Sequence, residues 1–361
     1  MRFRIDPLEM YKDLDEKYII NFLSTLGQAT WYSSYMVLLF PLGMFAFWFY
    51  DNKYIRIFSG IFTAVGFMTM VTQNSDSAFV AFGVMFFVMF WISMESNKRF
   101  ERFLEVVIMC LASFKFMGIC QRLFPENAVQ LDALPVFCSQ HPLIWVFLAI
   151  AIVVYFCFRQ MEKSGAIDVS GVKILRVIAL AVVLIGGIAA VVYIYLNTTG
   201  RLPENMKSSN NYLLFDEYWG NNRGSSWIFA AKSFFKGSLI RKLFGCGPDG
   251  FSSFVYSFFG AELAAKWGEN TVLTCAHNEW LNALVNLGIV GVTAYIGIFV
   301  SAFRRFLKKA DDYPELIAIA VSIVCYMGHN FFCYQQIICT PVIFILMGAG
   351  ESVIRYGKIR E

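Results

Sequence analysis

The chain has few charged residues for its length. Only 16% of its 361 residues are charged, while 58% are hydrophobic, and soluble domains usually carry about 25% charged residues. A chain this apolar needs a lipid environment. The net charge of +4 is small, and Lys and Arg gather in short loops between apolar runs, a pattern typical of membrane orientation and not of nucleic-acid binding.

Metal-binding patterns are also missing. The nine Cys include no C-x-x-C pair and no cluster with His at zinc spacing, so we expect no metal and no cofactor. Cys110, Cys157 and Cys325 lie inside apolar runs and are expected to be buried free thiols. Cys246 and Cys275 flank one predicted loop, where either a disulfide or two thiols would fit.

The sequence shows neither a secretory signal peptide nor internal repeats. Residues 1–30 carry charges of both signs and are expected to be a retained amphipathic segment. The absence of repeats disfavours the inverted-repeat architecture of many transporters. The Asp13-Leu14-Asp15 string resembles the D-x-D motif of nucleotide-sugar glycosyltransferases, but no Rossmann-like domain fits around it, so a solvated acidic run is expected.

Long apolar runs take up most of the chain. Each is near the roughly 20 residues that a helix needs to cross a bilayer, and each is apolar on all sides, which favours helices over barrel strands. The sequence predicts an all-α polytopic membrane protein with about nine transmembrane helices. They are expected at 31–50, 54–71, 78–94, 103–120, 142–158, 174–195, 277–300, 316–333 and 338–354.

Basic residues occur in alternate loops. They are Lys53 with Arg56, Lys98 with Arg99 and Arg102, Arg159 with Lys163 and Lys173, and Arg304 with Arg305, Lys308 and Lys309. The positive-inside rule makes these loops and the tail cytoplasmic. Six helices over 31–195 then precede one large extracytoplasmic loop at 196–276, and three helices with the tail follow over 277–361. Because successive loops lie on opposite sides of the membrane, the residues before the first predicted helix are expected outside the cell. They would lie inside if another membrane segment were present in 17–30.

The large loop contains a predicted amphipathic helix at about 224–236. Its apolar residues recur at a spacing of three and four, as on one helix face. They are Trp227, Ala230, Ala231, Phe234 and Phe235. Such a helix can lie in the membrane interface, with its aromatic side chains towards lipid and its lysines near phosphates.

A glycine-rich turn, LFGCGPDGF, follows this helix. Its residue Gly247 and neighbouring glycines permit backbone amides to approach an anionic group. A plain turn between a helix and a loop is the other interpretation.

The segment AHNEWLNALVNLGIVGVTAYIGIF begins the next spanning helix, with His277 and Asn278 expected in its first turn. Asn278, Asn282 and Asn286 are four residues apart and predict one polar stripe facing the bundle. Gly288 and Gly291 would allow close packing. His277 is either an acid–base group or a structural residue at the helix start. His141 is expected at the interface, and His329 as a satisfied buried histidine.

Four motifs stand in a characteristic order: WGNNRGSSW, LFGCGPDGF, AHNEWLNALVNLGIVGVTAYIGIF and GHNFFCYQQIICTPVIFILMGAGE. Over about 215–350 this order resembles the O-antigen ligase/polymerase family, and more closely its branch of capsular and exopolysaccharide polymerases. The resemblance implies a glycosyltransferase that moves a glycan from an undecaprenyl-diphosphate carrier to a sugar hydroxyl on the outer face of the cell membrane. Neither a nucleotide sugar nor a metal takes part in that reaction.

In that family an Arg at the position of Arg223 and a His at the position of His277 are essential. A guanidinium can hold a departing diphosphate through two hydrogen bonds, and a His can take the proton of the attacking hydroxyl or hold that hydroxyl in line. Asn278, Asn282, Arg241 and Gly247 are expected to bind substrate, with Arg201 an alternative cation.

One segment departs from the family pattern. Many relatives carry a Ser-Arg pair at the external end of an early helix, where this chain has QNSDSAFVAFG. Asp76 then stands in place of the Arg. Either it binds substrate differently, by orienting an acceptor hydroxyl or pairing with Arg223, or the two segments do not correspond.

The expected partners are the lipid-linked donor, the sugar acceptor, membrane lipid and a chain-length regulator. Two other functions remain open. A ligase of the same family would move the glycan to a different acceptor, because donor motifs are shared. A transporter of lipid-linked oligosaccharide, from a different class, would need charged residues along a path through its helices.

Overall fold

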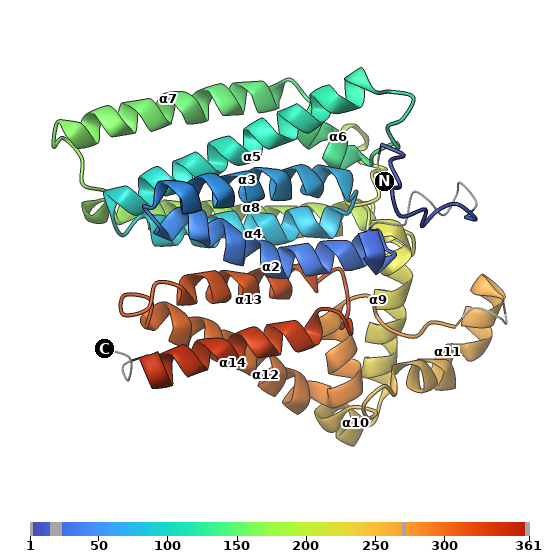
Figure 1. The fold of residues 1–361 in the computed structure, drawn as a ribbon. Coiled ribbons are helices and arrows are strands. Elements are labelled where there is room, and N and C mark those ends of the chain that lie inside the picture. The colour runs from blue at the N-terminus through green and yellow to red at the C-terminus, as the bar shows by residue number, and fades with distance from the viewer. Residues whose placement is uncertain (1–2, 15–23, 269–271, 358–361) are drawn as a thin grey trace. The chain divides into compact units, whose positions relative to one another are not determined.

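The computed structural model describes residues 3–14, 24–268 and 272–357, without the side chain of Asn221. Every regular element in this part of the chain is an α-helix or a 3-10 helix (Figure 1). Asp15 of the D-x-D-like string lies outside the described residues, as do residues 17–23 of the 17–30 segment.

Seven of the described helices are long and apolar enough to cross a membrane, so the chain is a helical membrane-spanning protein. They are α2 (Ala29–Phe49), α3 (Lys53–Thr72), α4 (Asp76–Ser93), α5 (Asn97–Leu123), α7 (Leu143–Lys163), α8 (Ile174–Thr198) and α12 (Glu279–Lys308). The first six confirm the six helices predicted over 31–195. The remaining helices are α6 (Ala133–Gln140), α9 (Trp219–Lys236), α10 (Leu239–Phe244), α11 (Phe251–Trp267), α13 (Leu316–His329) and α14 (Thr340–Tyr356), with short 3-10 turns at Ser24–Leu26, Val169–Gly171 and Glu204–Met206.

The last two predicted spans are shorter than expected. Helix α13 has 14 residues and α14 has 17, and the 10 residues between them are not helical. A 14-residue helix rises about 21 Å, against a hydrocarbon core of about 30 Å. By length and composition the described helices therefore supply seven spans, and the expected count of nine stays a prediction.

The chain divides into two compact units. Unit 1 comprises Met1–Arg176, Ala302–His329 and Gln336–Glu361, and unit 2 comprises Val177–Ser301 and Asn330–Gln335. This division differs from the predicted segments, because α8 and the first part of α12 group with the large loop. All the predicted site residues except Asp76 belong to unit 2.

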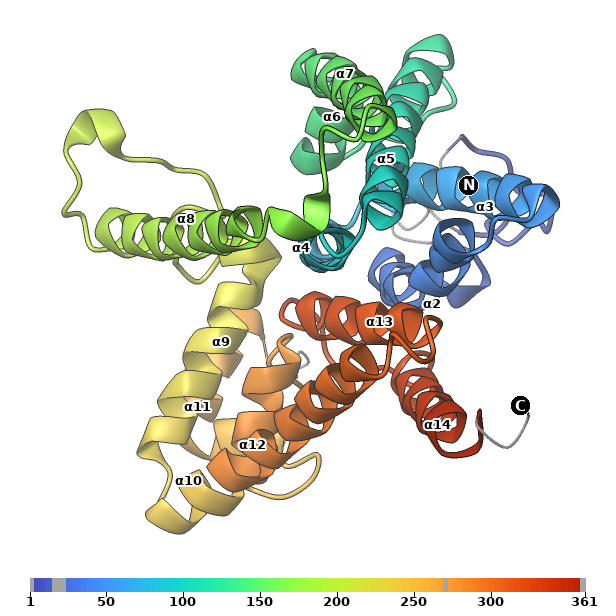
Figure 2. The ribbon, with the colours of Figure 1, turned by 90° about the vertical axis from the view of Figure 1, so that its left-hand side faces the viewer.

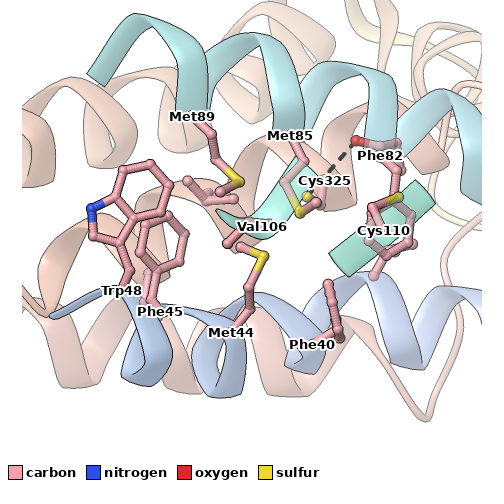
Figure 3. Packing of buried hydrophobic residues seen from close by; sticks show 14 of the residues in the cluster. Phe40, Met44, Phe45, Trp48, Phe82, Met85, Met89, Val106, Cys110 and Cys325 are labelled. Carbon is pink, nitrogen blue, oxygen red and sulfur yellow. Dashed lines mark hydrogen bonds between the residues drawn. The ribbon is translucent and has the colours of Figure 1, made fainter. Parts of the chain in front are cut away.

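The core of unit 1 forms between α2, α4, α5 and α13. Figure 3 shows Met44 and Phe45 of α2 facing Met85 of α4, with Cys325 of α13 nearby; the exposed fraction of each of these side chains is 1% or less. Helix α13 packs against both α2 and α4. Because α13 is enclosed by other helices of the unit, packing against protein is enough to explain its apolar composition.

Charged residues of unit 1 are joined in ion pairs at the helix ends where the predicted cytoplasmic loops lie. Arg102 is 8% exposed and donates to Glu105 at 3.0 Å and to Asp51 at 3.2 Å. Arg56 donates to the same Glu105 at 2.8 Å. Buried charges are tolerated when they are paired and hydrogen-bonded, so these residues have a structural role.

The large loop of unit 2 is mostly helical. Helix α9 packs against α11, with α10 at the turn between them (Figure 2). They share an aromatic core that includes Phe229, Phe251 and Phe259. The loop therefore has a folded core of its own and can hold side chains in fixed positions.

The amphipathic helix predicted at 224–236 corresponds to α9, which begins at Trp219, and its predicted apolar residues divide between the protein core and the exposed surface. Phe229 and Ser233 are buried, at 1% and 0% exposed, whereas Phe235 is 73% exposed. The reason is that α11 covers the side of α9 that carries Phe229. A sequence pattern within one helix does not show which face a distant helix will cover.

Candidate functional site

His277 and Asn278 lie just before α12, which begins at Glu279. Asn278 acts as the N-cap, since its Oδ1 accepts from the Leu281 amide at 3.0 Å and its carbonyl from the Asn282 amide at 2.8 Å. The expectation that both residues occupy the first turn is therefore off by two residues. His277 has a left-handed backbone, with φ of 50°, which is uncommon for a residue other than glycine.

Asn282 fixes the segment that approaches the helix. Its Oδ1 accepts from the Ala276 amide at 3.2 Å. The side-chain oxygens of both Asn278 and Asn282 thus hold backbone amides on either side of His277. Their predicted contact with substrate would have to come from the amide nitrogens.

Helix α12 is broken at Gly288, where φ is 69° and ψ is −175°. The Tyr295 hydroxyl donates to Glu279 Oε1 at 2.9 Å, although 16 residues of straight helix would separate their Cα atoms by about 24 Å. The half at 279–287 therefore folds back on the half that follows Gly288. The single straight span predicted at 277–300 is wrong in this respect, because Gly288 takes a conformation that other residues rarely adopt.

The break frees two backbone carbonyls that the glycine-rich turn then uses. The amides of Cys246 and Gly247 donate to the carbonyls of Val285 and Asn286 at 3.1 and 3.0 Å. In an unbroken helix these carbonyls would accept from residues 289 and 290. A Cβ on Gly288 would overlap the backbone of Leu243, so the close approach predicted for Gly288 is confirmed.

The same bonds decide between the two interpretations of the turn. The amides of Gly245, Cys246, Gly247 and Gly250 all donate to carbonyls of the chain. The turn therefore docks on α12, and a substrate-binding role of Gly247 cannot rest on its amide. Arg241 lies beside this turn with its guanidinium 5.1 Å from the centre of the Phe254 ring; its predicted substrate contact stays a prediction.

Arg223 follows an irregular first turn of α9. Gly220 and Asn222 have φ of 57° and 67°, and the Arg223 Nη1 donates to the Gly220 carbonyl at 2.8 Å. The side chain is half-buried. One edge of the guanidinium is thereby fixed, and the structure shows no other hydrogen bond from it to a described residue.

Arg223 and His277 lie close together, although 53 residues separate them in the chain. Burial lowers the pKa of His277 below its usual value, and the charge of Arg223 lowers it further. The imidazole is therefore neutral at neutral pH and has a nitrogen that can accept a proton. Its ring meets the ring of Tyr334 edge-on, with 5.3 Å between the ring centres. The charge of Arg223 thus reaches His277 across the large loop, and the catalytic roles of the two residues stay predictions.

An apolar groove begins one turn beyond Arg223. Trp227, Ala231 and Phe235 follow Arg223 at intervals of four residues, which places all four on one face of α9. The last three line the groove, which has a volume of about 760 Å³ and also contains Phe215, Ile228, Lys232, Lys236, Phe259 and Leu281. Arg223 itself does not line the groove; it stands one helical turn before Trp227, which does.

A smaller polar pocket of about 140 Å³ lies on another face of α12. It is lined by Glu279, Asn282, Ala283, Asn286, Leu287, Tyr295 and Gln335, with Pro248 and Asp249 of the glycine-rich turn. On a helix, 279, 282 and 286 share a face and 281 points away from it. The polar pocket and the groove therefore lie on different sides of the half at 279–287.

Three residues of this pocket, Glu279, Tyr295 and Gln335, were not anticipated as site residues. An acidic residue at the start of a membrane helix is a signal that could have drawn attention to Glu279. No sequence signal connects it with Tyr295 or Gln335, because their contact depends on the break at Gly288.

Asp76 is the first residue of α4, in unit 1. Its charge adds to burial in raising the pKa of the Cys138 thiol to about 11, so it lies near α6. Its predicted contact with substrate or with Arg223 stays a prediction. Arg201 is exposed, and its guanidinium is 5.6 Å from the centre of the Tyr195 ring, as expected of a solvated loop charge.

The remaining Cys and His predictions have mixed outcomes. All nine Cys are free, so Cys246 and Cys275 are thiols and not a disulfide. Cys110 and Cys325 are buried as expected, but Cys157 is exposed, because the statistics of soluble cores do not distinguish a side chain that faces away from the protein. His329 is 1% exposed and bonded at both ring nitrogens, which confirms the satisfied buried histidine.

The described residues contain no group of three or more His, Cys, Asp or Glu that could hold a metal ion. Comparison of the chain with family models, curated proteins and solved structures finds no match. The assignment of a function therefore rests on the site geometry and on the motif order.

Proposed function

We propose that this protein is a membrane glycosyltransferase that polymerises undecaprenyl-diphosphate-linked repeat units into surface polysaccharide. The observation that supports it most is that the charge of Arg223 reaches His277, while Trp227, one helical turn beyond Arg223, lines an apolar groove. An isoprenoid diphosphate needs an apolar channel for its chain and a cation for its head. The four motifs that resemble the O-antigen ligase/polymerase family favour the same reaction.

The groove would hold the part of the isoprenoid nearest the head. Trp227, Ala231 and Phe235 offer apolar surface. Lys232 and Lys236 line the same groove and could bind headgroup phosphates. Arg223, one turn before Trp227, would then reach the diphosphate. Its guanidinium offers two parallel N–H groups to phosphate oxygens and stays charged at any physiological pH.

In the transfer step, the acceptor hydroxyl oxygen attacks the anomeric carbon of the donor sugar. The bond between that carbon and the diphosphate oxygen breaks, and the diphosphate leaves on the carrier with the electron pair. Arg223 stabilises the developing negative charge. Neutral His277 takes the hydroxyl proton. Both products are then a lengthened glycan and a free carrier diphosphate, and the reaction needs neither a metal nor a cofactor.

The alternation of basic loops supports a position of this site on the extracytoplasmic face of the cell membrane. Ser209, which is exposed in the large loop, provides a way to check the orientation. Ser209→Cys should react with a membrane-impermeant thiol reagent in intact cells, above the background of the parent protein. Reaction only after lysis would place the loop in the cytoplasm and exclude the proposed site.

The main test compares two arginines of unit 2. Arg223→Lys keeps the positive charge but loses the two parallel N–H donors of the guanidinium. Polymer formation in a deletion strain should therefore fall about 100-fold or more. Arg201→Lys, at an exposed position beside Tyr195, should support normal polymer at equal protein level. Full activity of Arg223→Lys would contradict binding of the diphosphate by the paired N–H groups of Arg223.

The same assay separates the alternatives. A polymerase lengthens the glycan on the carrier, and its loss leaves single repeat units on the carrier. A ligase, which shares the donor site, would leave long carrier-linked glycan and an unmodified acceptor. A transporter would change the membrane side of the carrier-linked glycan without lengthening it. A chain-length regulator, as a further partner, would change the length distribution and not the total sugar transferred.

A further inference from the structure

We infer that the polar pocket at the broken helix binds the hydroxyl groups of the acceptor sugar, with the Glu279 carboxylate as their main hydrogen-bond acceptor. This assignment rests on the proposed function and identifies which part of unit 2 receives the second substrate.

The carboxylate is held in a defined position. The Tyr295 hydroxyl donates to Glu279 Oε1 at 2.9 Å, and Gln335 Nε2 donates to the Tyr295 oxygen at 3.0 Å. Three segments of unit 2 thus converge on one carboxyl group: the start of α12, its part beyond the break, and the 330–335 segment. Because the Tyr295 contact requires the break at Gly288, the left-handed glycine and the carboxylate belong to one arrangement.

The second carboxylate oxygen has acceptor capacity left over. Glu279 is 3% exposed, and the Gln335 backbone amide is a further donor near its carboxyl group. By hydrogen-bond geometry, however, Oε2 is buried without a partner among the described residues. A buried polar atom that lacks a partner is costly, and it persists where a ligand supplies the missing donor. A sugar hydroxyl is such a donor, and it forms a short, strong bond to a carboxylate.

The other side chains suit a polyhydroxylated ligand. Asn282, Asn286 and Gln335 line the same pocket, and amides both donate to and accept from hydroxyls. Whole small-molecule ligands usually occupy about 300 Å³ or more, whereas this pocket measures about 140 Å³. It therefore accepts one edge of a sugar ring, and the rest of the glycan stays outside.

The pocket is also placed suitably for proton transfer. Glu279 follows His277 by two residues, so their Cα atoms are about 7 Å apart at most. The groove proposed for the donor lies on a different side of the same short helix, at Leu281. Donor and acceptor would approach the helix start from two sides, with His277 between them.

The test separates acceptor binding from donor binding. Purified wild-type protein, Glu279→Gln, Tyr295→Phe and the control Glu204→Gln are assayed with a synthetic lipid-diphosphate oligosaccharide donor and a soluble oligosaccharide acceptor. Glu204 is exposed on a 3-10 turn of the large loop. Binding of the donor alone and the midpoint of thermal unfolding are measured for each variant.

Glu279→Gln should lower kcat/KM for the acceptor about 10- to 100-fold, the range for loss of a hydrogen bond to a charged group. Donor binding and unfolding should stay at wild-type values. Tyr295→Phe, which only releases the carboxylate, should raise the KM of the acceptor several-fold with a smaller change in kcat. Glu204→Gln should match wild type.

Three results would overturn the assignment: unchanged acceptor kinetics in Glu279→Gln, an equal loss of donor binding, or a dependence of wild-type activity on a divalent cation that Glu279→Gln abolishes. If Glu279→Gln does not fold, the acceptor KM of Tyr295→Phe decides. A wild-type protein that transfers no glycan from the donor would instead contradict the proposed function itself.

Discussion

His329 of unit 1 and His277 of unit 2 are both followed by asparagine, yet their surroundings differ. His329 is 1% exposed, with Nδ1 3.3 Å from the Ser34 hydroxyl and Nε2 3.1 Å from the Ser77 hydroxyl. His277 is half-buried, has a left-handed backbone and lies near the charge of Arg223. Hydrogen bonds at both ring nitrogens give His329 a structural role. Half-burial beside a cation keeps His277 neutral, so that a ring nitrogen can accept a proton.

The arginines of the two units differ in the same way. Arg102 of unit 1 is bonded to two carboxylates, so its charge is compensated within the chain. Arg223 of unit 2 donates to one carbonyl and sits next to Asn222, whose φ is 67°. Residues in rare backbone conformations cost of order 1–3 kcal/mol and gather at functional sites. Such residues occur in both units, at Asn74 of unit 1 as well as at Asn222 and His277 of unit 2, so the hydrogen-bonding pattern of the arginines and not the backbone distinguishes the units.

The largest expected effect comes from replacing His277 or His329 with alanine. His277→Ala should lower glycan transfer about 100- to 10,000-fold, because a positioned acid or base is lost, while the protein accumulates normally. His329→Ala should instead lower stability by about 1–3 kcal/mol, since the Ser34 and Ser77 hydroxyls lose a buried partner. Activity per folded molecule and the unfolding midpoint in detergent distinguish the two. Normal activity of His277→Ala would remove the contrast between the histidines.

The second comparison concerns two glycines of α12, one at the break (Gly288) and one beyond it (Gly297). Gly288→Ala would place a side chain at φ of 69° against the backbone of Leu243, so stability should fall by about 2 kcal/mol or more. Gly297→Ala, later in the same helix with open space around it, should cause no loss. Thermal unfolding and acceptor kinetics are measured on both. Equal behaviour of the two variants would mean that α12 is straight.

The smallest expected effect separates the two neighbouring phenylalanines of α9. Phe235 is 73% exposed and lines the groove, so Phe235→Ser should weaken donor binding about 3- to 10-fold, as expected for loss of part of one apolar contact. Phe234 packs against the core shared by α9 and α11, so Phe234→Ser should lower stability and leave the donor affinity of the folded protein unchanged. The reverse result would mean that the groove is not the lipid site.

The sequence predicted the first six spanning helices to within a few residues at most ends, and it predicted a helix in the large loop. Hydropathy and helix length are local properties, so they can be read from consecutive residues. His277 and Arg223 were selected from the motif order that they belong to, and their roles stay predictions. The burial of Phe229 and Ser233 in α9 could not be predicted, since it depends on packing against α11.

Helix α12 shows most clearly what can be predicted from the sequence and what cannot. The sequence by itself determined that an apolar helix begins near His277 with a polar stripe of asparagines. Only the tertiary structure decided that the helix breaks at Gly288, that Cys246 and Gly247 take the carbonyls released there, and that Glu279 meets Tyr295. A glycine within an apolar run is compatible with close packing and with a break alike. The choice depends on whether a distant segment supplies hydrogen bonds to the freed carbonyls, which is a property of the folded chain.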